Sequence, residues 1–412
     1  MNTVSVGDPS AEHHPSQRLL GLAYLMRAAF RGDDLMPLAQ SMMERAARDE
    51  LDAEALFDLS TILQLQGIRD VGLATLDLAL QIKRVFEMPA SRPPAIRLLA
   101  LMAPGDLMVN APLPFLLEDS DISLTMLYLV PGEPLPAQLP EHDVAFVAIS
   151  ETTQTHDLLE QLAGSMNSWD RPVLIRPERI MLTSRAKTYD LLKHTPGIRV
   201  AQTVQASRVQ LQEMLAGDGP LQAWSSGLAY PIIIRPVDSH AGHGLEKVDD
   251  AAGLVAYLRG QAEDEFFVSR FIDYSGADGW FRKYRVVLID GVPYAGHMGV
   301  STHWMIHYLN AGMTESAAKR AEEEQFMRDF DLDFATQHAA ALQTLHERFG
   351  LEYLVIDCAQ TIEGDLLVFE VDPGAVVHAM DPEEMFPYKR PAMRKIFAAF
   401  RMMLQRAVQA GT

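Results

Sequence analysis

The segment from Tyr353 to Asp381 constrains the fold of this chain more than any other. It reads YLVIDCAQTIEGDLLVFEVDPGAVVHAMD and contains two apolar, β-branched runs, Tyr353–Cys358 and Leu366–Val371, on either side of a polar turn at Glu363-Gly364. Glycine adopts the positive φ that a tight reversal needs, so this pattern predicts a β-hairpin. If the loop has two residues, the numbers of cross-strand partners sum to 727.

Three carboxylates share one face of this predicted hairpin. The register sets Asp357 opposite Glu370, and Asp372 points to the same face because side chains alternate along a strand. Like charges placed opposite each other destabilise a sheet, so the pattern predicts a cation at this face. Carboxylate oxygens favour Mg²⁺, which proteins usually hold together with substrate phosphates, and Mn²⁺ can substitute. A solvated strand face, reached by a one-residue slip in register, is the alternative.

Length and composition indicate a soluble protein of several domains. A chain of 412 residues is too long for one ordinary core, and its hydrophobic and charged fractions, 48% and 22%, are those of globular proteins. No apolar run approaches the roughly 20 residues of a membrane span. The first residues lack the features of a signal peptide, and we expect a disordered tail over 1–15.

Cysteine content and charge indicate the compartment and exclude some partners. The single cysteine, Cys358, rules out an internal disulfide and fits the reducing cytoplasm, where we expect the protein to reside. A net charge of −20 disfavours nonspecific binding to nucleic acid or to an anionic membrane.

Residues 16–90 have a helical period and are rich in Leu, Ala and Met. Breaks fall at Gly32 and Gly67, which are 35 residues apart, so two helix-turn-helix units resemble a tetratricopeptide pair. A plain helical bundle is the alternative. Two repeats are too few to stand alone, so we expect this block to pack on the rest of the chain, on a second subunit or on a protein partner.

Residues 95–180 alternate short apolar runs with helical or loop segments, after a stiff linker at Pro89–Pro94. The alternation predicts a small, open and mostly parallel α/β sheet. No G-x-G-x-x-G follows its first strand, so a dinucleotide-binding fold is not supported. The expected strands are Ala95–Met102, Ile122–Val130, Val144–Ser150 and Pro172–Arg176, with a helix near His156–Met166.

Basic side chains and glycines after residue 183 predict anion binding. Ser184 is a candidate N-cap, and Arg185 and Lys187 follow in the first turn, where the helix dipole favours anions over cations. A bound anion would explain them, and simple solvation is the alternative. Farther on, an Ile-rich strand ends in Arg235 and a Gly-rich loop follows, whose backbone N–H groups could approach phosphate oxygens.

The pair Asp290-Gly291 is the strongest short hairpin signal in the chain. On the strand before it, Lys283 and Arg285 alternate with apolar residues and therefore point to one face. An exposed basic face is the alternative to a functional one. We expect the acidic run Glu322–Glu324 to be a solvated helix face and Ile396–Val408 to be an amphipathic closing helix.

In the order of its motifs, the segment from Thr183 to Asp381 resembles the ATP-grasp superfamily, which includes D-alanine–D-alanine ligase and glutathione synthetase. The motifs are the strand and Gly-rich loop of Ile232–Leu245, the strand Phe266–Ile272, and Asp357 followed by Glu370-Val371-Asp372. The resemblance implies an ATP-grasp fold over 183–412. Within it, residues 183–272 would cover the nucleotide and 273–412 would carry metal and catalysis. The preceding α/β domain would span 95–180, after the helical domain of 16–90.

The resemblance also implies roles for individual residues. Lys187, or Arg185 if the alignment slips by two, would bind phosphate, and Arg235 stands where the family has a second lysine. Ser269 replaces an acidic residue of the hinge that binds adenine, and Asp372 stands where asparagine is common. The implied nucleotide-binding residues are Lys187, Arg235, His240, Gly242, Gly244, Ser269, Arg270, Phe271 and Ile272; the metal ligands are Asp357, Glu370 and Asp372; the catalytic residues are Arg285, His307 and Asn310.

The activity that the resemblance implies is that of an ATP-dependent carboxylate–amine ligase using ATP and Mg²⁺. It would act on small-molecule carboxylates and amines through an acyl phosphate. Two alternatives remain open on the sequence. One is a nucleotide-binding protein without catalysis that uses its helices for protein interaction. The other is an ATP-grasp phosphotransferase.

Overall fold

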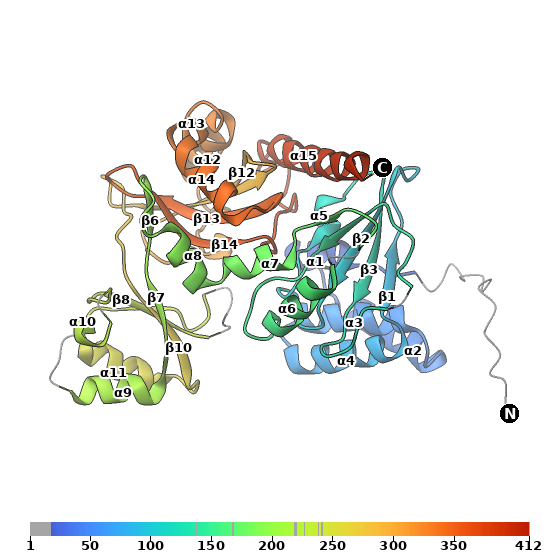
Figure 1. Cartoon of the computed structure of the whole chain (residues 1–412), viewed down its shortest axis with the longest axis horizontal. Coiled ribbons are helices and arrows are strands. Elements are labelled where there is room, and N and C mark those ends of the chain that lie inside the picture. Colours follow the sequence, from blue (N-terminus) through green and yellow to red (C-terminus); the bar gives the residue numbers. More distant parts are fainter. Residues whose placement is uncertain are drawn as a thin grey trace.

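The computed structural model describes residues 18–136, 138–166, 169–217, 221–225, 227–237, 239 and 242–411. The tail expected over 1–15 lies outside these residues. The described residues form three sheets with helices packed around them, in agreement with the expected mixed α/β class. In Figure 1 the first sheet and the N-terminal helices lie on the right, and the other two sheets lie on the left, one above the other.

Four helices form the N-terminal block as two helix-turn-helix units. The breaks at Gly32 and Gly67 fall where predicted, with φ of 79° and 78°. Asp52 caps the third helix through a bond from Ala55 N, and Asp58 accepts bonds from the backbone of residues 20 and 21. The helices are α1 (Leu22–Phe30), α2 (Met36–Arg48), α3 (Ala53–Leu65) and α4 (Arg69–Ile82).

The first sheet has the order β1-β3-β2-β4-β5 and is parallel except for its edge strand β1. The parallel strands agree with the prediction. The antiparallel strand β1 was missed, because its four residues directly follow the last helix and precede the proline linker. The strands are β1 (Val85–Met88), β2 (Ile96–Met102), β3 (Ile122–Tyr128), β4 (Val144–Val147) and β5 (Val173–Leu174); the accompanying helices are α5 (Leu113–Leu116) and α6 (His156–Ser165).

A short helical connection, α7 (Pro177–Ile180), η3 (Met181–Thr183) and α8 (Arg185–Leu192), leads to the second sheet. This sheet is antiparallel, with the order β7-β10-β8-β9 and its own apolar core. Its elements are β7 (Thr203–Ser207), α9 (Arg208–Ala216), α10 (Leu221–Trp224), β8 (Ile232–Pro236), β9 (Glu246–Val248), α11 (Ala251–Gly260) and β10 (Glu265–Arg270).

The third sheet has the order β12-β11-β13-β14-β6 and contains both predicted hairpins. Asp290 and Gly291 form the two-residue turn of the first, with φ of 48° and 79°. The elements are β6 (Ile198–Val200), β11 (Phe281–Ile289), β12 (Val292–Ser301), η4 (Tyr308–Asn310), α12 (Ala317–Asp329), α13 (Phe334–Gln337), α14 (Ala339–Phe349), β13 (Tyr353–Gln360) and β14 (Leu366–Asp372).

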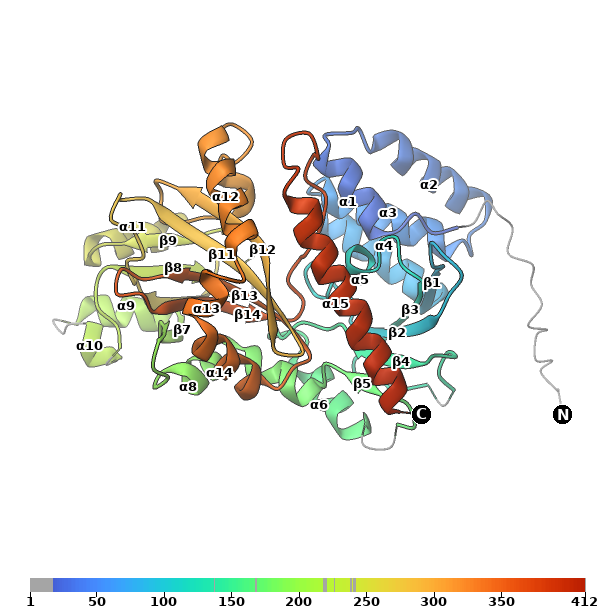
Figure 2. The same cartoon turned by 90° about the horizontal axis from the view of Figure 1, so that it is seen from above.

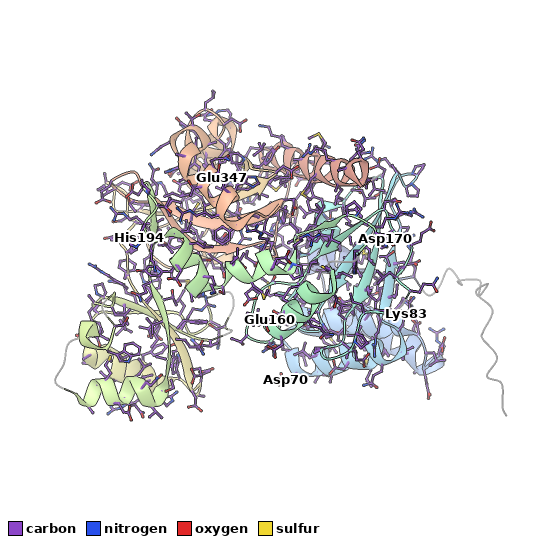
Figure 3. All side chains as sticks on the ribbon, in the orientation of Figure 1. Asp70, Lys83, Glu160, Asp170, His194 and Glu347 are labelled. Atoms are coloured by element: carbon purple, nitrogen blue, oxygen red, sulfur yellow. The ribbon has the colours of Figure 1, made fainter. Side chains whose placement is uncertain are left out.

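The closing helix α15 (Lys389–Ala410) is longer than predicted and lies between the first and third sheets, as Figure 2 shows. Its apolar face is buried, and Phe400 contacts Phe146 of β4 and Tyr353 of β13. Within the described residues, no helix is long and apolar enough to cross a membrane. Acidic side chains such as Asp70, Glu160 and Glu347 lie on outer helical surfaces (Figure 3).

Candidate functional site

The candidate site is a row of four side chains across the third sheet. Pairing sets His297 of β12 opposite Arg285 of β11, Arg285 opposite Asp357 of β13, and Asp357 opposite Glu370 of β14. Directly paired residues point to the same face of an antiparallel sheet, so the four side chains are neighbours. The predicted pairing of Asp357 with Glu370 is confirmed, but the two-residue loop from which it was predicted is wrong.

The register of this row depends on two β-bulges. The hairpin loop spans Thr361–Asp365, and partners near it sum to 726; a bulge at Phe369 restores 727 at Asp357. A second bulge at Gly296 brings His297, rather than Gly296, opposite Arg285. A bulge adds one unpaired residue and re-aims the side chains beyond it.

Two cationic side chains bind Asp357. Arg285 donates from Nε and Nη2 to its two carboxylate oxygens at 2.7 and 2.9 Å, and Lys283 Nζ lies 2.8 Å from Oδ2. Burial raises the pKa of Asp357, but Arg285 and Lys283 outweigh burial and hold this pKa well below its usual range. The prediction that Lys283 and Arg285 share a face is confirmed. The positive charge expected beside Asp357 is supplied by these two side chains.

Glu370 and Asp372 have fewer cationic partners than Asp357, which is bound by two. Glu370 is exposed and pairs with Arg185 at 3.2 Å, while Asp372 accepts a bond from Gly374 N at 2.7 Å. Burial and the nearby Glu370 raise the pKa of Asp372 to about 7. A buried carboxylate beside a second carboxylate favours a cation at this end of the row.

Arg185 connects the row to the second sheet. It is the first residue of α8, and Ser184 occupies the predicted N-cap position without a side-chain bond to the helix. The guanidinium pairs with Glu370 and lies over the ring of Phe267 at 5.7 Å. Phe267 pairs in turn with Arg235 of β8. Lys187, two residues farther along the helix, is exposed. Arg185 contacts both sheets, through Glu370 of β14 and Phe267 of β10.

The glycines of the predicted phosphate loop adopt left-handed conformations. Gly242 and Gly244 have φ of 78° and 63°, and a Cβ at Gly242 would lie 3.2 Å from the sulfur of Met305. At the end of the preceding strand, Arg235 Nε donates to Ser239 Oγ at 3.0 Å. His240, a predicted member of this loop, lies outside the described residues.

The predicted adenine hinge runs along the end of β10. Ser269 and Arg270 are its last two residues, and Phe271 N donates to Pro231 O at 2.9 Å. The Phe271 ring lies 5.8 Å from the ring of Trp304. Ile272 packs with Tyr274, against the third sheet. These contacts join the hinge to the segment that follows β12.

His307 and Asn310 belong to that segment and begin and end a short 3-10 turn. His307 N donates to Asn310 Oδ1 at 2.9 Å, and Asn310 N donates to His307 O at 2.9 Å. Burial, with Lys283 and Arg285 next in importance, lowers the pKa of His307. The imidazole is therefore neutral near pH 7 and close enough to the row to sense its charges.

The described acids only partly fit a metal ion. Among the residues that the structure describes, no group of three or more His, Cys, Asp or Glu side chains converges as metal ligands. Both oxygens of Asp357 are bound by bases, whereas Glu370 and Asp372 lie on the same face and lack a full complement of cations. The donor chemistry of Glu370 and Asp372 fits a hard divalent cation.

Sequence reasoning missed two residues near the site. His297 was missed because a hairpin without a bulge sets Gly296 opposite Arg285; the glycine in the strand was the available signal. The expectation for Glu323 was wrong. This residue of the acidic run is fully buried and accepts a bond from Met298 N at 3.1 Å, so one member of the run faces the core.

The comparisons with known proteins give no family assignment. No family model matches the chain, and no curated protein matches it. Similar solved structures include a RimK domain ATP-grasp protein from Sphaerobacter thermophilus, at 16% identity and a TM-score of 0.42, covering 73% of this chain and 98% of that one. A D-alanine–D-alanine ligase from Bacillus anthracis complexed with ATP has 13% identity and a TM-score of 0.44, with 77% and 99% covered.

A third similar structure is the VanG D-Ala:D-Ser ligase from Enterococcus faecalis, with 14% identity, a TM-score of 0.44, and 77% and 99% covered. The activity of this chain is therefore inferred from the geometry of its own candidate site.

Proposed function

We propose that this protein is an ATP-dependent ligase that joins a carboxylate to an amine and releases ADP and phosphate. The observation that supports the proposal most is the row across the third sheet, in which Arg285 lies between an acidic end and His297. The pKa of His297, and that of His307 in the following 3-10 turn, is lowered. An acidic end that favours a cation, beside a fixed guanidinium, suits a reaction in which negative charge develops first on a transferred phosphate and then on the oxygen of a tetrahedral carbon.

In the first step, a substrate carboxylate oxygen attacks the γ-phosphorus of ATP, and the bond to ADP breaks. Arg235 and Arg185, with Lys187 nearby, would hold the phosphates, since a guanidinium binds phosphate oxygens in pairs. The Gly242–Gly244 backbone would lie over them. A divalent cation such as Mg²⁺, held by Glu370 and Asp372 with Asp357 beside them, would neutralise phosphate charge.

In the second step, an amine attacks the acyl phosphate carbon, and phosphate leaves with the bonding electron pair. Arg285 is held by Asp357 and by Val376 O, which accepts from Nη1 at 2.7 Å, so its remaining N–H groups point in a fixed direction. We assign it to the developing oxyanion. His307, neutral near pH 7, would accept the proton of the amine, and Asn310 would orient His307.

The test is a screen of amino-acid pairs with MgATP, monitored for ADP, on the unaltered protein, Glu370→Gln and Glu347→Gln. Glu347 lies exposed on α14, away from the row, and serves as the matched control. We expect ADP release that requires both an acid and an amine, a loss of about 100-fold in E370Q, and no loss in E347Q. ADP release with an acid or alcohol alone would favour a phosphotransferase, and equal rates in E370Q and E347Q would contradict the assigned site.

A further inference from the structure

At the His297 end of the row lies a buried cluster of charged and phenolic groups that the proposed reaction does not use. Its centre is Lys389, the first residue of α15, which is 5% exposed. Its Nζ lies 3.1 Å from Asp381 Oδ2 and 3.3 Å from Glu323 Oε1, and burial lowers the pKa of Lys389 to about 6. A lysine buried at a helix N-terminus is unfavourable, because its charge opposes the helix dipole and loses its hydration. Nearby polar partners must offset this cost.

The two acids of the cluster are themselves fixed. Glu323 of α12 accepts bonds from Met298 N of β12 and from Tyr388 Oη, at 3.1 and 2.7 Å. Burial raises the pKa of Glu323 to about 8 and that of Asp381 to about 7, so near neutral pH the pair can retain a proton. The cluster is therefore a satisfied polar network that ties α12, β12 and α15 together.

Tyr308 is the point at which this cluster meets the candidate site. Lys389 Nζ donates to the Tyr308 hydroxyl and lies 4.0 Å from the centre of its ring. The Tyr308 hydroxyl also donates to Asp381 at 3.4 Å. On its other side, the Tyr308 ring lies 4.7 Å from the ring of His297, the end of the row. Tyr308 directly follows His307 in the same 3-10 turn that contains Asn310.

We infer that Lys389 is a positioning residue: through Tyr308 it fixes the 3-10 turn that carries His307 and Asn310 against the row. This role rests on the proposed ligase function, and it concerns the amine-attack step, because the turn lies at the His297 end of the row. The phosphate contacts proposed above come from the second sheet and from α8, whereas the contacts of Lys389 are with Asp381, Glu323 and Tyr308. A displaced turn would misalign a proton acceptor, and a shift of about 1 Å can lower a rate by about 100-fold.

The test uses the full chain and compares Lys389→Met with Lys395→Met. Lys395 lies on the same helix but is exposed and pairs with Asp331, so it controls for loss of a lysine from α15. Hydrogen–deuterium exchange should be about tenfold faster over residues 303–311 in K389M and unchanged in K395M, with β11 unchanged in both. MgADP affinity should stay within about twofold of the unaltered protein.

If ligase turnover is measurable, kcat should fall about 100-fold in K389M at an unchanged KM for ATP. Unchanged exchange over 303–311 in folded K389M, or a loss of MgADP binding, would overturn the inference. Should K389M fail to fold, Tyr308→Phe is the second variant, because it removes only the hydroxyl that Lys389 binds. Unchanged exchange over residues 303–311 in Y308F would also overturn the inference. An unaltered protein that releases no ADP refutes the ligase function, while the exchange data still decide the role of Lys389.

Discussion

At the scale of single residues, the central group is Arg285, because its three hydrogen bonds fix both its place and its direction. Two bonds go to Asp357 and one to Val376 O, so the guanidinium joins β13 to the segment after β14. A lysine carries the same charge but cannot reproduce a planar, bidentate contact. The shape of the cation, as well as its charge, therefore matters at this position.

Arg285→Lys should lower ligase turnover by about 100-fold and stability by about 3 kcal/mol, since it leaves a buried carboxylate with an incomplete partner. The measurements are ADP release and urea unfolding. Arg282→Lys is the matched control, because Arg282 lies on the same strand and pairs with the exposed Asp278. Equal effects of R285K and R282K would contradict a special role for Arg285.

His378 makes stability depend on pH. It lies between the rings of Phe30 and Phe115, and burial lowers its pKa from 6.5 to about 4. A base with a lowered folded-state pKa stabilises the protein fully above the unfolded pKa, and this contribution is lost as pH falls from 6.5 towards 4. The loss amounts to about 2–3 kcal/mol for a shift of this size.

Urea unfolding at pH 7 and pH 4.5 should therefore show a smaller drop in stability for His378→Leu than for the unaltered protein. His303→Leu is the control for loss of a histidine, because His303 is exposed. If H378L and the unaltered protein lose the same free energy between the two pH values, His378 is not the group responsible.

At the level of secondary-structure elements, the β-bulges of the two hairpins set the register that aligns His297, Arg285, Asp357 and Glu370. Without the bulge at Phe369, a register that sums to 726 near the loop would continue to Asp357 and set it opposite Phe369. Without the one at Gly296, the imidazole of His297 would leave the row. A Cβ at Gly296 would lie 2.9 Å from Arg285 O and 3.1 Å from Arg285 Cγ, so only glycine fits here.

Gly296→Ala should therefore move Arg285 and reduce ADP release by about tenfold or more while the protein stays folded. Gly164→Ala is the matched control: Gly164 lies in α6 with no heavy atom near its missing Cβ, and alanine there should keep or slightly raise stability. Full activity of G296A would show that the bulge does not position Arg285.

Sequence patterns predicted the elements of the site better than its register. The apolar runs and the Asp290-Gly291 turn were enough to pair Lys283 and Arg285 with one face, because strand alternation is a local property. The bulges depend on cross-strand packing, such as the contact of Phe369 with Tyr274 at 5.0 Å, which no local pattern encodes. For the same reason the burial of Glu323 was missed: its partner Lys389 lies far along the chain.

At the scale of the whole molecule, α15 joins the first sheet to the third. Arg401 of this helix pairs through Nε and Nη2 with both oxygens of Asp121, at 2.7 and 2.6 Å, just before β3. The same helix begins with Lys389, beside the site. The helix therefore links the start of β3 in the first sheet to the candidate catalytic segment.

Arg401→Met should lower the free energy of unfolding by about 1 kcal/mol, because the lost pair is bidentate but partly exposed. Urea unfolding checks this value, with Arg394→Met, an exposed arginine on the same helix, as the control. If R401M and R394M have the same stability, the Asp121 contact does not contribute to docking of α15.

We propose that Glu370 and Asp372, at the acidic end of the row, hold a divalent cation beside the bound nucleotide, and calorimetric titration with a non-hydrolysable ATP analogue tests this most directly. We expect binding that Mg²⁺ strengthens about tenfold or more, and a loss of this Mg²⁺ effect in Glu370→Gln with E347Q unaffected. No binding of the analogue, or an Mg²⁺ effect that E370Q retains in full, would contradict a cation site at Glu370.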